Sequence, residues 1–178
     1  MERKYVYEKY VSTLENVKKT LEEYGIAVIP NVLNEEEIKD MNNGIWDYLE
    51  HASEKMEVPI YRNKPKSWRT YEEYFAEKSM LLQKYGVGHA QHLWNLRQNP
   101  KIIKVFESIY QTSDLATSFD GTSFGLPHEQ TKIKPSIEKW FHTDQNYSQN
   151  DFMAVQSWVT GYDVRDGDAT LGFFGKFT

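Results

Sequence analysis

The chain has 178 residues, the size of one domain that can bury a core of its own. Its apolar fraction of 39%, charged fraction of 26% and net charge of −5 are typical of a soluble globular protein. The negative charge argues against a general nucleic-acid binder, and the absence of cysteine excludes disulfides, thiolate metal sites and a cysteine nucleophile.

The N-terminus carries charged residues and no apolar run after them, so it does not have the pattern of a signal peptide. No stretch approaches the length of a membrane span. A chain without cysteine also fits a reducing compartment. We therefore expect a soluble, cytoplasmic protein that interacts with neither membrane nor nucleic acid.

The first predicted element is a helix that ends at Gly25. Apolar residues recur at helical spacing before it: Tyr10, Leu14, Val17, Leu21 and Tyr24. A short β-branched run at 26–29 predicts a strand. Asn34 with Glu37 three residues later predicts a capping box for a second helix that reaches Leu49.

The middle of the chain predicts a loop and two more helices. Prolines and charges at 57–69 indicate the loop, and Thr70 with Glu73 would cap a helix that continues to Tyr85. Asn99-Pro100 is a typical helix start, and the helix it begins would reach Tyr110.

From residue 115 the pattern changes from helical to β-prone. Short runs suited to strands are separated by turn residues; they cover 115–119, 122–125, 139–142, 152–162 and 169–174. Helices first and strands later predict an α+β arrangement or a helix-decorated β-barrel in one domain.

Two residues in the run Trp140-Phe141-His142-Thr143-Asp144-Gln145 are candidate metal ligands. A histidine and a carboxylate two residues apart on a strand point to the same face. They can supply two of the three ligands of the 2-His-1-carboxylate triad that holds non-haem Fe(II). A half-buried histidine followed by a turn aspartate would give the same pattern.

The predicted strand at 153–160 places Gln156 and Trp158 on one face. That face could line a polar pocket with an aromatic wall. It could equally be the solvent face of an edge strand.

The chain resembles the phytanoyl-CoA dioxygenase family of Fe(II)/2-oxoglutarate-dependent oxygenases. The resemblance begins with EYGIAVIPNVL at 23–33 and resumes at 114–121. Its most specific parts are WFHTDQ at 140–145 and VQSW at 155–158. It covers nearly the whole chain, but only about the first two-thirds of that family's domain.

The resemblance implies a double-stranded β-helix of the jelly-roll or cupin type, decorated by helices and incomplete at the C-terminal end. Residues 1–112 would be the mainly helical part with one strand near 26–29, and 113–178 would hold the first strands of the β-helix. His142 and Asp144 match the proximal iron ligands. Trp158 matches an aromatic position near the 2-oxoglutarate pocket, and Gln156 shares its face. Fe(II) is then the cofactor and 2-oxoglutarate the cosubstrate, with ascorbate as an aid, and the substrate is a small molecule that the sequence does not name.

Other polar residues fit the resemblance less well. Ser118 and Asp120 could face the same cavity, although a structural role is the stronger expectation. We expect capping or surface roles for the remaining histidines: His51, His89, His92 and His128.

The chain departs from the family where a distal histidine and a basic residue that binds 2-oxoglutarate would follow. His142 is the last histidine in the sequence, and the late basic residues Arg165 and Lys176 do not occupy the expected place. The carboxylate at Asp144 favours hydroxylation over halogenation, because related halogenases lack it. We expect an incomplete oxygenase with weak turnover by itself. The alternatives are a catalytically degenerate binding module or a third ligand donated by a partner subunit.

Overall fold

The computed structural model describes residues 7–76, 80–127, 130, 142, 144, 148, 154–165, 168 and 172. Within them the helices are α1 (Val17–Tyr24), α2 (Glu35–Ala52), α3 (Gln91–Arg97) and α4 (Pro100–Tyr110). Three short 3-10 turns, η1 (Glu8–Tyr10), η2 (Pro65–Trp68) and η4 (Val87–His89), and one π-helical turn, η3 (Tyr71–Phe75), connect them. No helix of the described residues is both long enough and apolar enough to cross a bilayer.

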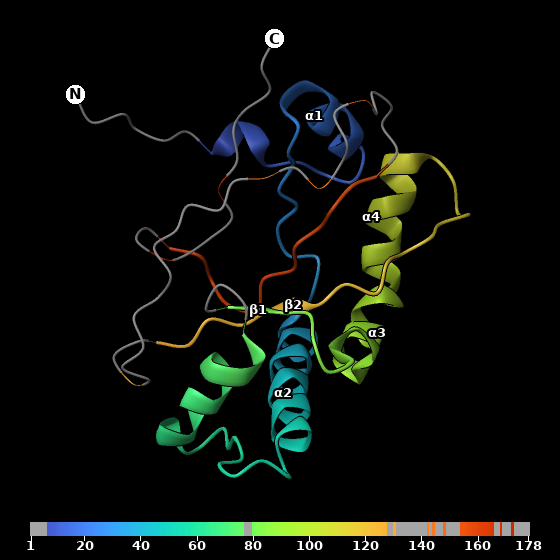
Figure 1. Ribbon diagram of the computed structural model, residues 1–178. Coiled ribbons are helices and arrows are strands. Elements are labelled where there is room, and N and C mark those ends of the chain that lie inside the picture. Colours follow the sequence, from blue (N-terminus) through green and yellow to red (C-terminus); the bar gives the residue numbers. More distant parts are fainter. Residues whose placement is uncertain are drawn as a thin grey trace, which may run out of the picture.

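The helix α2 is the longest element and forms the centre of the helical part (Figure 1). Asn34 accepts a hydrogen bond from the Glu37 backbone while the Glu37 carboxylate accepts one from the Asn34 backbone, so the predicted capping box is confirmed. Met41, Ile45 and Leu49 are buried along one side of the helix. This stripe holds α2 against α3, the largest contact between two elements of the described chain.

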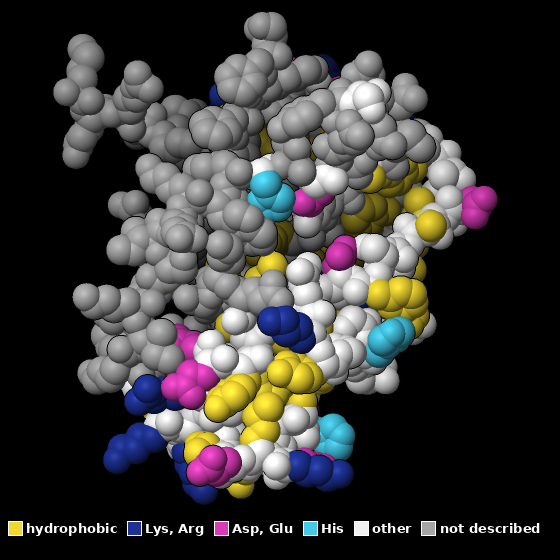
Figure 2. All heavy atoms as spheres, viewed as in Figure 1, with side chains coloured by type: hydrophobic (Ala, Val, Ile, Leu, Met, Phe, Trp, Pro, Cys, Tyr) yellow, Lys and Arg dark blue, Asp and Glu magenta, His cyan; other side chains and the backbone are white. Residues whose placement is uncertain are grey.

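The hydrophobic core lies between α2 and the 60–96 part of the chain. Its buried members are Ile45, Leu49, Ile60, Tyr71, Phe75, Leu82, Val87 and Leu93. Trp46 packs edge-on against Phe124, with ring centroids 4.9 Å apart, so the segment after β2 also contributes to this core. On the coloured part of the face seen in Figure 2, both acidic and basic side chains are present.

The described strands form a two-stranded antiparallel pair, β1 (Leu81–Leu82) with β2 (Thr122–Ser123). The register pairs Leu81 with Ser123 and Leu82 with Thr122. A single parallel bridge joins Val11 to Val28, which is all that is seen of the strand predicted at 26–29. Residues 115–119 and 154–165 belong to no helix or strand, so the strands predicted at 115–119 and 152–162 are not found in the described residues. The double-stranded β-helix and the division at residue 112 stay predictions, because most of the predicted runs at 139–142 and 169–174 lie outside the described residues.

Two predicted helices have the wrong bounds. The first starts at Val17, not at Tyr10. The Ser12 amide donates to the Val28 carbonyl and the Val28 amide donates to the Tyr10 carbonyl, which keeps Val11 extended. The third was predicted over 70–85 but ends at Phe75, where Ala76 is extended. Leu81 and Leu82 then enter a strand, because pairing with β2 buries Leu82 completely.

Candidate functional site

The two predicted metal ligands lie next to each other. The His142 Nε2 atom is 3.1 Å from the Asp144 Oδ1 atom, and the two side chains are 47% and 54% exposed. His142 lies outside any helix or strand and Asp144 lies at a bend. The two groups are therefore close in space, although His142 is not in a strand and residues 139–141 lie outside the described residues. Their role as metal ligands stays a prediction.

The spacing of these two atoms fits neighbouring ligands of one metal ion. Ligand bonds of about 2.1 Å at a right angle put two donor atoms about 3 Å apart. Imidazole nitrogen and carboxylate oxygen are also the donor types of the facial triad. Within the described residues no group of three or more histidine, cysteine or acidic side chains gathers at one point. The pair has the donor types and the spacing of two metal ligands, and the described residues offer no third beside it. Its role as a metal site stays a prediction.

The segment that carries Gln156 and Trp158 is attached to α2 through Gly161. The Asn42 side chain donates from Nδ2 to the Gly161 carbonyl oxygen at 2.9 Å. A Cβ atom added at Gly161 would lie 2.1 Å from Asn42 Oδ1 and 2.9 Å from Met41 Cε, so a side chain there would displace the ends of both side chains. Gln156 is exposed and Trp158 is 50% exposed, as the predicted solvent face would be. Their role beside 2-oxoglutarate stays a prediction.

Ser118 and Asp120 bond to each other, since the Ser118 hydroxyl donates to the Asp120 carboxylate. Both are exposed. Arg97 fixes the backbone here, because its guanidinium donates to the Gly88 carbonyl at 2.5 Å and to the Asp120 carbonyl at 2.9 Å. The same guanidinium lies over the Phe119 ring, 5.5 Å from the centroid. These contacts favour the structural role that the sequence analysis preferred for Ser118 and Asp120.

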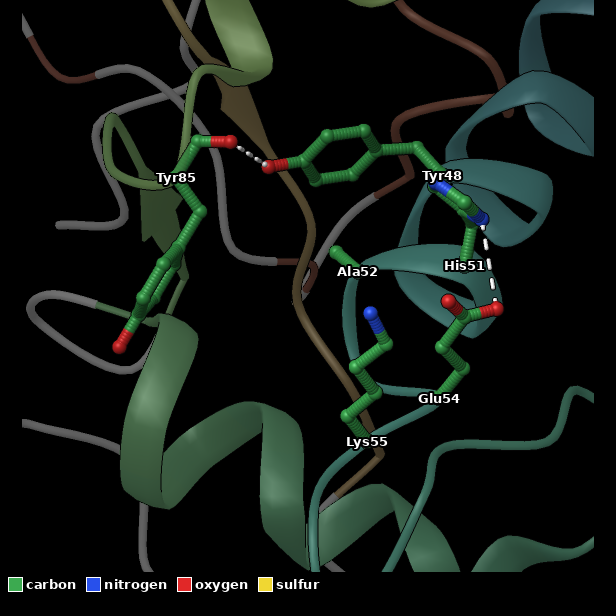
Figure 3. A pocket seen from close by; sticks show the side chains of 6 residues that line it. All are labelled: Tyr48, His51, Ala52, Glu54, Lys55 and Tyr85. Atoms are coloured by element: carbon green, nitrogen blue, oxygen red, sulfur yellow. Dashed lines mark hydrogen bonds and ion pairs between the residues drawn. The ribbon is translucent and has the colours of Figure 1, made fainter.

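Two hollows of the described part of the chain are lined by residues other than the predicted site residues. The larger is an open hollow of about 340 Å³ at the C-terminal end of α2 (Figure 3). Its lining residues are Tyr48, His51, Ala52, Glu54, Lys55 and Tyr85. Tyr48 donates to the Tyr85 carbonyl at 2.9 Å across the hollow, and His51 lies 3.6 Å from Glu54. The second hollow, of about 80 Å³, lies between α2 and α3 beside His92.

The other histidines differ in their surroundings. His51 and His89 are exposed, as predicted, and His89 lies 4.9 Å from Phe119 between ring centroids. His92 is only 3% exposed, so the prediction of a capping or surface role is wrong for it. The signal for its burial was its place beside Leu93 and Leu96 in a short helix that the sequence analysis did not predict. His128 lies outside the described residues.

Comparison with known proteins supports a distant relationship to one oxygenase-related protein. A Dictyostelium discoideum protein described as "Putative phytanoyl-CoA dioxygenase" is 29% identical over 136 residues, which cover 70% of this chain and 35% of that protein. The chain is its distant relative. A second relative, "Ava biosynthesis cluster protein O" of Aspergillus versicolor, is 33% identical over 73 residues, or 40% of this chain and 22% of that protein.

Each match covers only part of this chain and only part of the relative. The chain spans about a fifth to a third of the length of the two curated relatives. No family model matches the chain, and no solved structure matches it. The comparisons therefore support an oxygenase-family relationship at the level of distant homology.

Proposed function

We propose that this chain is part of a non-haem Fe(II)/2-oxoglutarate-dependent oxygenase related to phytanoyl-CoA dioxygenases, and that it hydroxylates a small molecule. The observation that carries the proposal is the 3.1 Å approach of His142 Nε2 to Asp144 Oδ1. A second support is the distant Dictyostelium discoideum relative, whose description names the same family. Iron with 2-oxoglutarate would supply the oxidising power for attack on an unactivated C–H bond.

In this proposal His142 and Asp144 hold the metal through the imidazole nitrogen and one carboxylate oxygen. Both side chains are about half exposed, so the pair is open to an incoming ion and cosubstrate. The Asp144 carboxylate occupies a coordination position, which favours hydroxylation over halogenation. Gln156 and Trp158 would contact 2-oxoglutarate, and Gly161 would hold their segment on α2.

A third ligand is needed for tight iron binding. The 178-residue sequence has no histidine after His142, and the Dictyostelium discoideum relative is much longer than the part this chain spans. We infer that the third ligand and the residue that binds the distal carboxylate of 2-oxoglutarate come from residues outside this sequence. The chain alone should therefore turn over slowly.

A catalytically degenerate binding module is the second candidate. The sequence has no histidine after His142 that could serve as the third ligand. This alternative predicts a folded protein whose affinity for Fe(II) does not change when His142 is replaced by alanine.

Succinate formation tests the enzymatic proposal without knowledge of the substrate. The purified chain is incubated with Fe(II), ascorbate and 2-oxoglutarate, and succinate is measured beside Asp144→Ala and Asp163→Ala. Asp163 is an exposed carboxylate paired with Arg165 at 3.4 Å, so it controls for the loss of one acidic side chain. We expect succinate from the unchanged chain and from Asp163→Ala only. Equal amounts of succinate from the unchanged chain and from Asp144→Ala would contradict the proposed enzymatic activity.

A further inference from the structure

His92 is a buried histidine whose side chain forms no hydrogen bond with the described residues. Its side chain lies between α3 and α2, the residue is 3% exposed, and neither Nδ1 nor Nε2 has a hydrogen-bond partner there. A neutral imidazole carries one donor and one acceptor, so both are left unsatisfied. Such a group is costly to bury, and a charged imidazolium in the same place would be more so.

The packing around His92 leaves little room for its ring to move. A Cβ atom added at Gly44 of α2 would lie 2.4 Å from the His92 Cβ atom and 3.5 Å from its Cα atom, so the two helices touch at this point. One turn further along α2, the Tyr48 ring lies 6.4 Å from the imidazole between centroids. The imidazole is therefore held against α2, with both of its nitrogens shielded from the surface.

Charged groups approach His92 from several elements. From α2, Glu37 and Asp40 line the small hollow that His92 also lines, together with Asn95 of α3. The Glu37 carboxylate already accepts hydrogen bonds from the Asn34 backbone, from Asn99 and from Lys101 at the start of α4. From α3 itself, Arg97 places a positive charge near the ring. On η4, His89 is exposed.

These surroundings disfavour a proton on His92. Burial, and then the positive charge of Arg97, lower the pKa of His92 from 6.5 to about 4. The closed helix pair therefore binds a proton about 300-fold more weakly than a solvated histidine does. The acidic side chains of the hollow are the groups that could receive the imidazolium if the helices parted.

We propose that His92 makes the α2–α3 contact an acid-sensitive joint, in which protonation of the imidazole between the helices drives them apart. The open form has a solvated His92 that faces Glu37 and Asp40 and ionises at its ordinary pH. Between pH 6.5 and pH 4 each fall in pH favours the open form, because that form binds more protons. At pH 4.5 the opening equilibrium is shifted toward the open form by about 60-fold relative to pH 7.

The joint is connected to the segment that carries Gln156 and Trp158. Met41 of α2 lines the hollow beside His92. The same methionine would clash with a side chain at Gly161, where the 154–165 segment is attached to α2. Opening of the joint should therefore also loosen the attachment of that segment.

Hydrogen exchange of the α3 amides at pH 7 and pH 4.5 tests the joint on the full chain. We expect protection factors of α3 to fall by up to about 60-fold on acidification. His92→Phe keeps a ring but cannot titrate, so it should abolish most of this fall. His51→Phe replaces an exposed histidine of α2 and should behave like the unchanged chain.

An NMR titration of the His92 ring keeps the test decisive if His92→Phe does not fold. The proposal expects the native ring to titrate near pH 4, well below a solvated histidine. Titration of the His92 ring near pH 6.5 would contradict the proposed joint. An equal acid-induced loss of α3 protection in the unchanged chain and in a folded His92→Phe would also contradict it. Neither measurement uses metal or turnover, so its failure is separate from a failure of the proposed oxygenase function.

Discussion

In Gly44→Ala, helix propensity and helix packing change the free energy of unfolding in opposite directions. The sign of the measured change therefore shows which of the two is larger. Alanine in place of glycine inside a helix stabilises it by about 1 kcal/mol when nothing opposes the new methyl group. In this structure the new Cβ would lie 2.4 Å from His92 Cβ, far below the 3.5–4.0 Å of a normal carbon contact. The His92 Cβ atom is bonded directly to the α3 backbone and is not the end of a flexible side chain. To relieve the clash, α3 must therefore move.

The expected net effect is a loss of stability. Overpacking costs about 1–3 kcal/mol, and a clash this close belongs at the upper end of that range. After the gain in helix propensity we expect a net loss of about 1–2 kcal/mol, which lowers the melting temperature by about 2–8 °C in a domain of this size.

Urea unfolding followed by circular dichroism measures this loss. Asn43→Ala, at the neighbouring exposed position of α2, is the control and should change stability little. In a double-mutant cycle, His92→Gly removes the opposing Cβ and should recover about 1 kcal/mol of the cost of Gly44→Ala. A stabilisation of about 1 kcal/mol by Gly44→Ala alone would refute the described contact between α2 and α3.

Three further outcomes are expected. Leu49→Ala removes a completely buried core side chain and should cost about 2–5 kcal/mol in urea unfolding, and a change below 1 kcal/mol would contradict its place in the core. Glu37 bonds to Lys101, the Asn34 backbone and Asn99, which lower its pKa from 4.5 to about 2. The contribution of the ionised Glu37 to stability is therefore complete above pH 4.5 and is lost as the pH falls toward 2. Glu37→Gln, but not Glu36→Gln, should reduce the change of the urea midpoint with pH over this range. Gly161→Ala should speed proteolysis within 154–165, whereas Gly125→Ala, which has open space around it, should not; equal cleavage of both would count against the attachment to α2.

Local signals predicted three helix ends correctly, whereas the cap predicted at Thr70 is not formed. Asn34 and Glu37 form the capping box, Pro100 follows the capping Asn99, and Gly25 ends α1 with φ at 75°. Each of these signals acts through backbone groups within a few residues, so the sequence contains all that is needed to read it.

Long-range contacts account for what the sequence did not predict. Val11 is extended because its neighbours bond to Val28, and Leu82 leaves the predicted helix because it pairs with Thr122. The short helix α3 depends on its contact with α2, and that contact buries His92. Helical periodicity at 10–24 and at 70–85 carried no information about these partners.

The candidate site was predictable in part. The spacing of His142 and Asp144 indicated that both groups could approach one ion, and their donor atoms are 3.1 Å apart. The roles of Gln156 and Trp158 depend on which segment faces them, and an alternating pattern cannot specify a neighbour. Gly161, which fixes their segment on α2, gave no signal in the sequence because its contacts are with the distant Asn42 and Met41.

The central claim is that His142 and Asp144 bind the same metal ion. Anaerobic calorimetric titration with Co(II), as a stable substitute for Fe(II), tests it on the purified chain with His142→Ala, Asp144→Ala and the control Asp163→Ala. We predict one bound ion for the unchanged chain and for the control, and an affinity more than about 10-fold lower for each of the other two variants. Equal Co(II) affinity in all four proteins would contradict the claim.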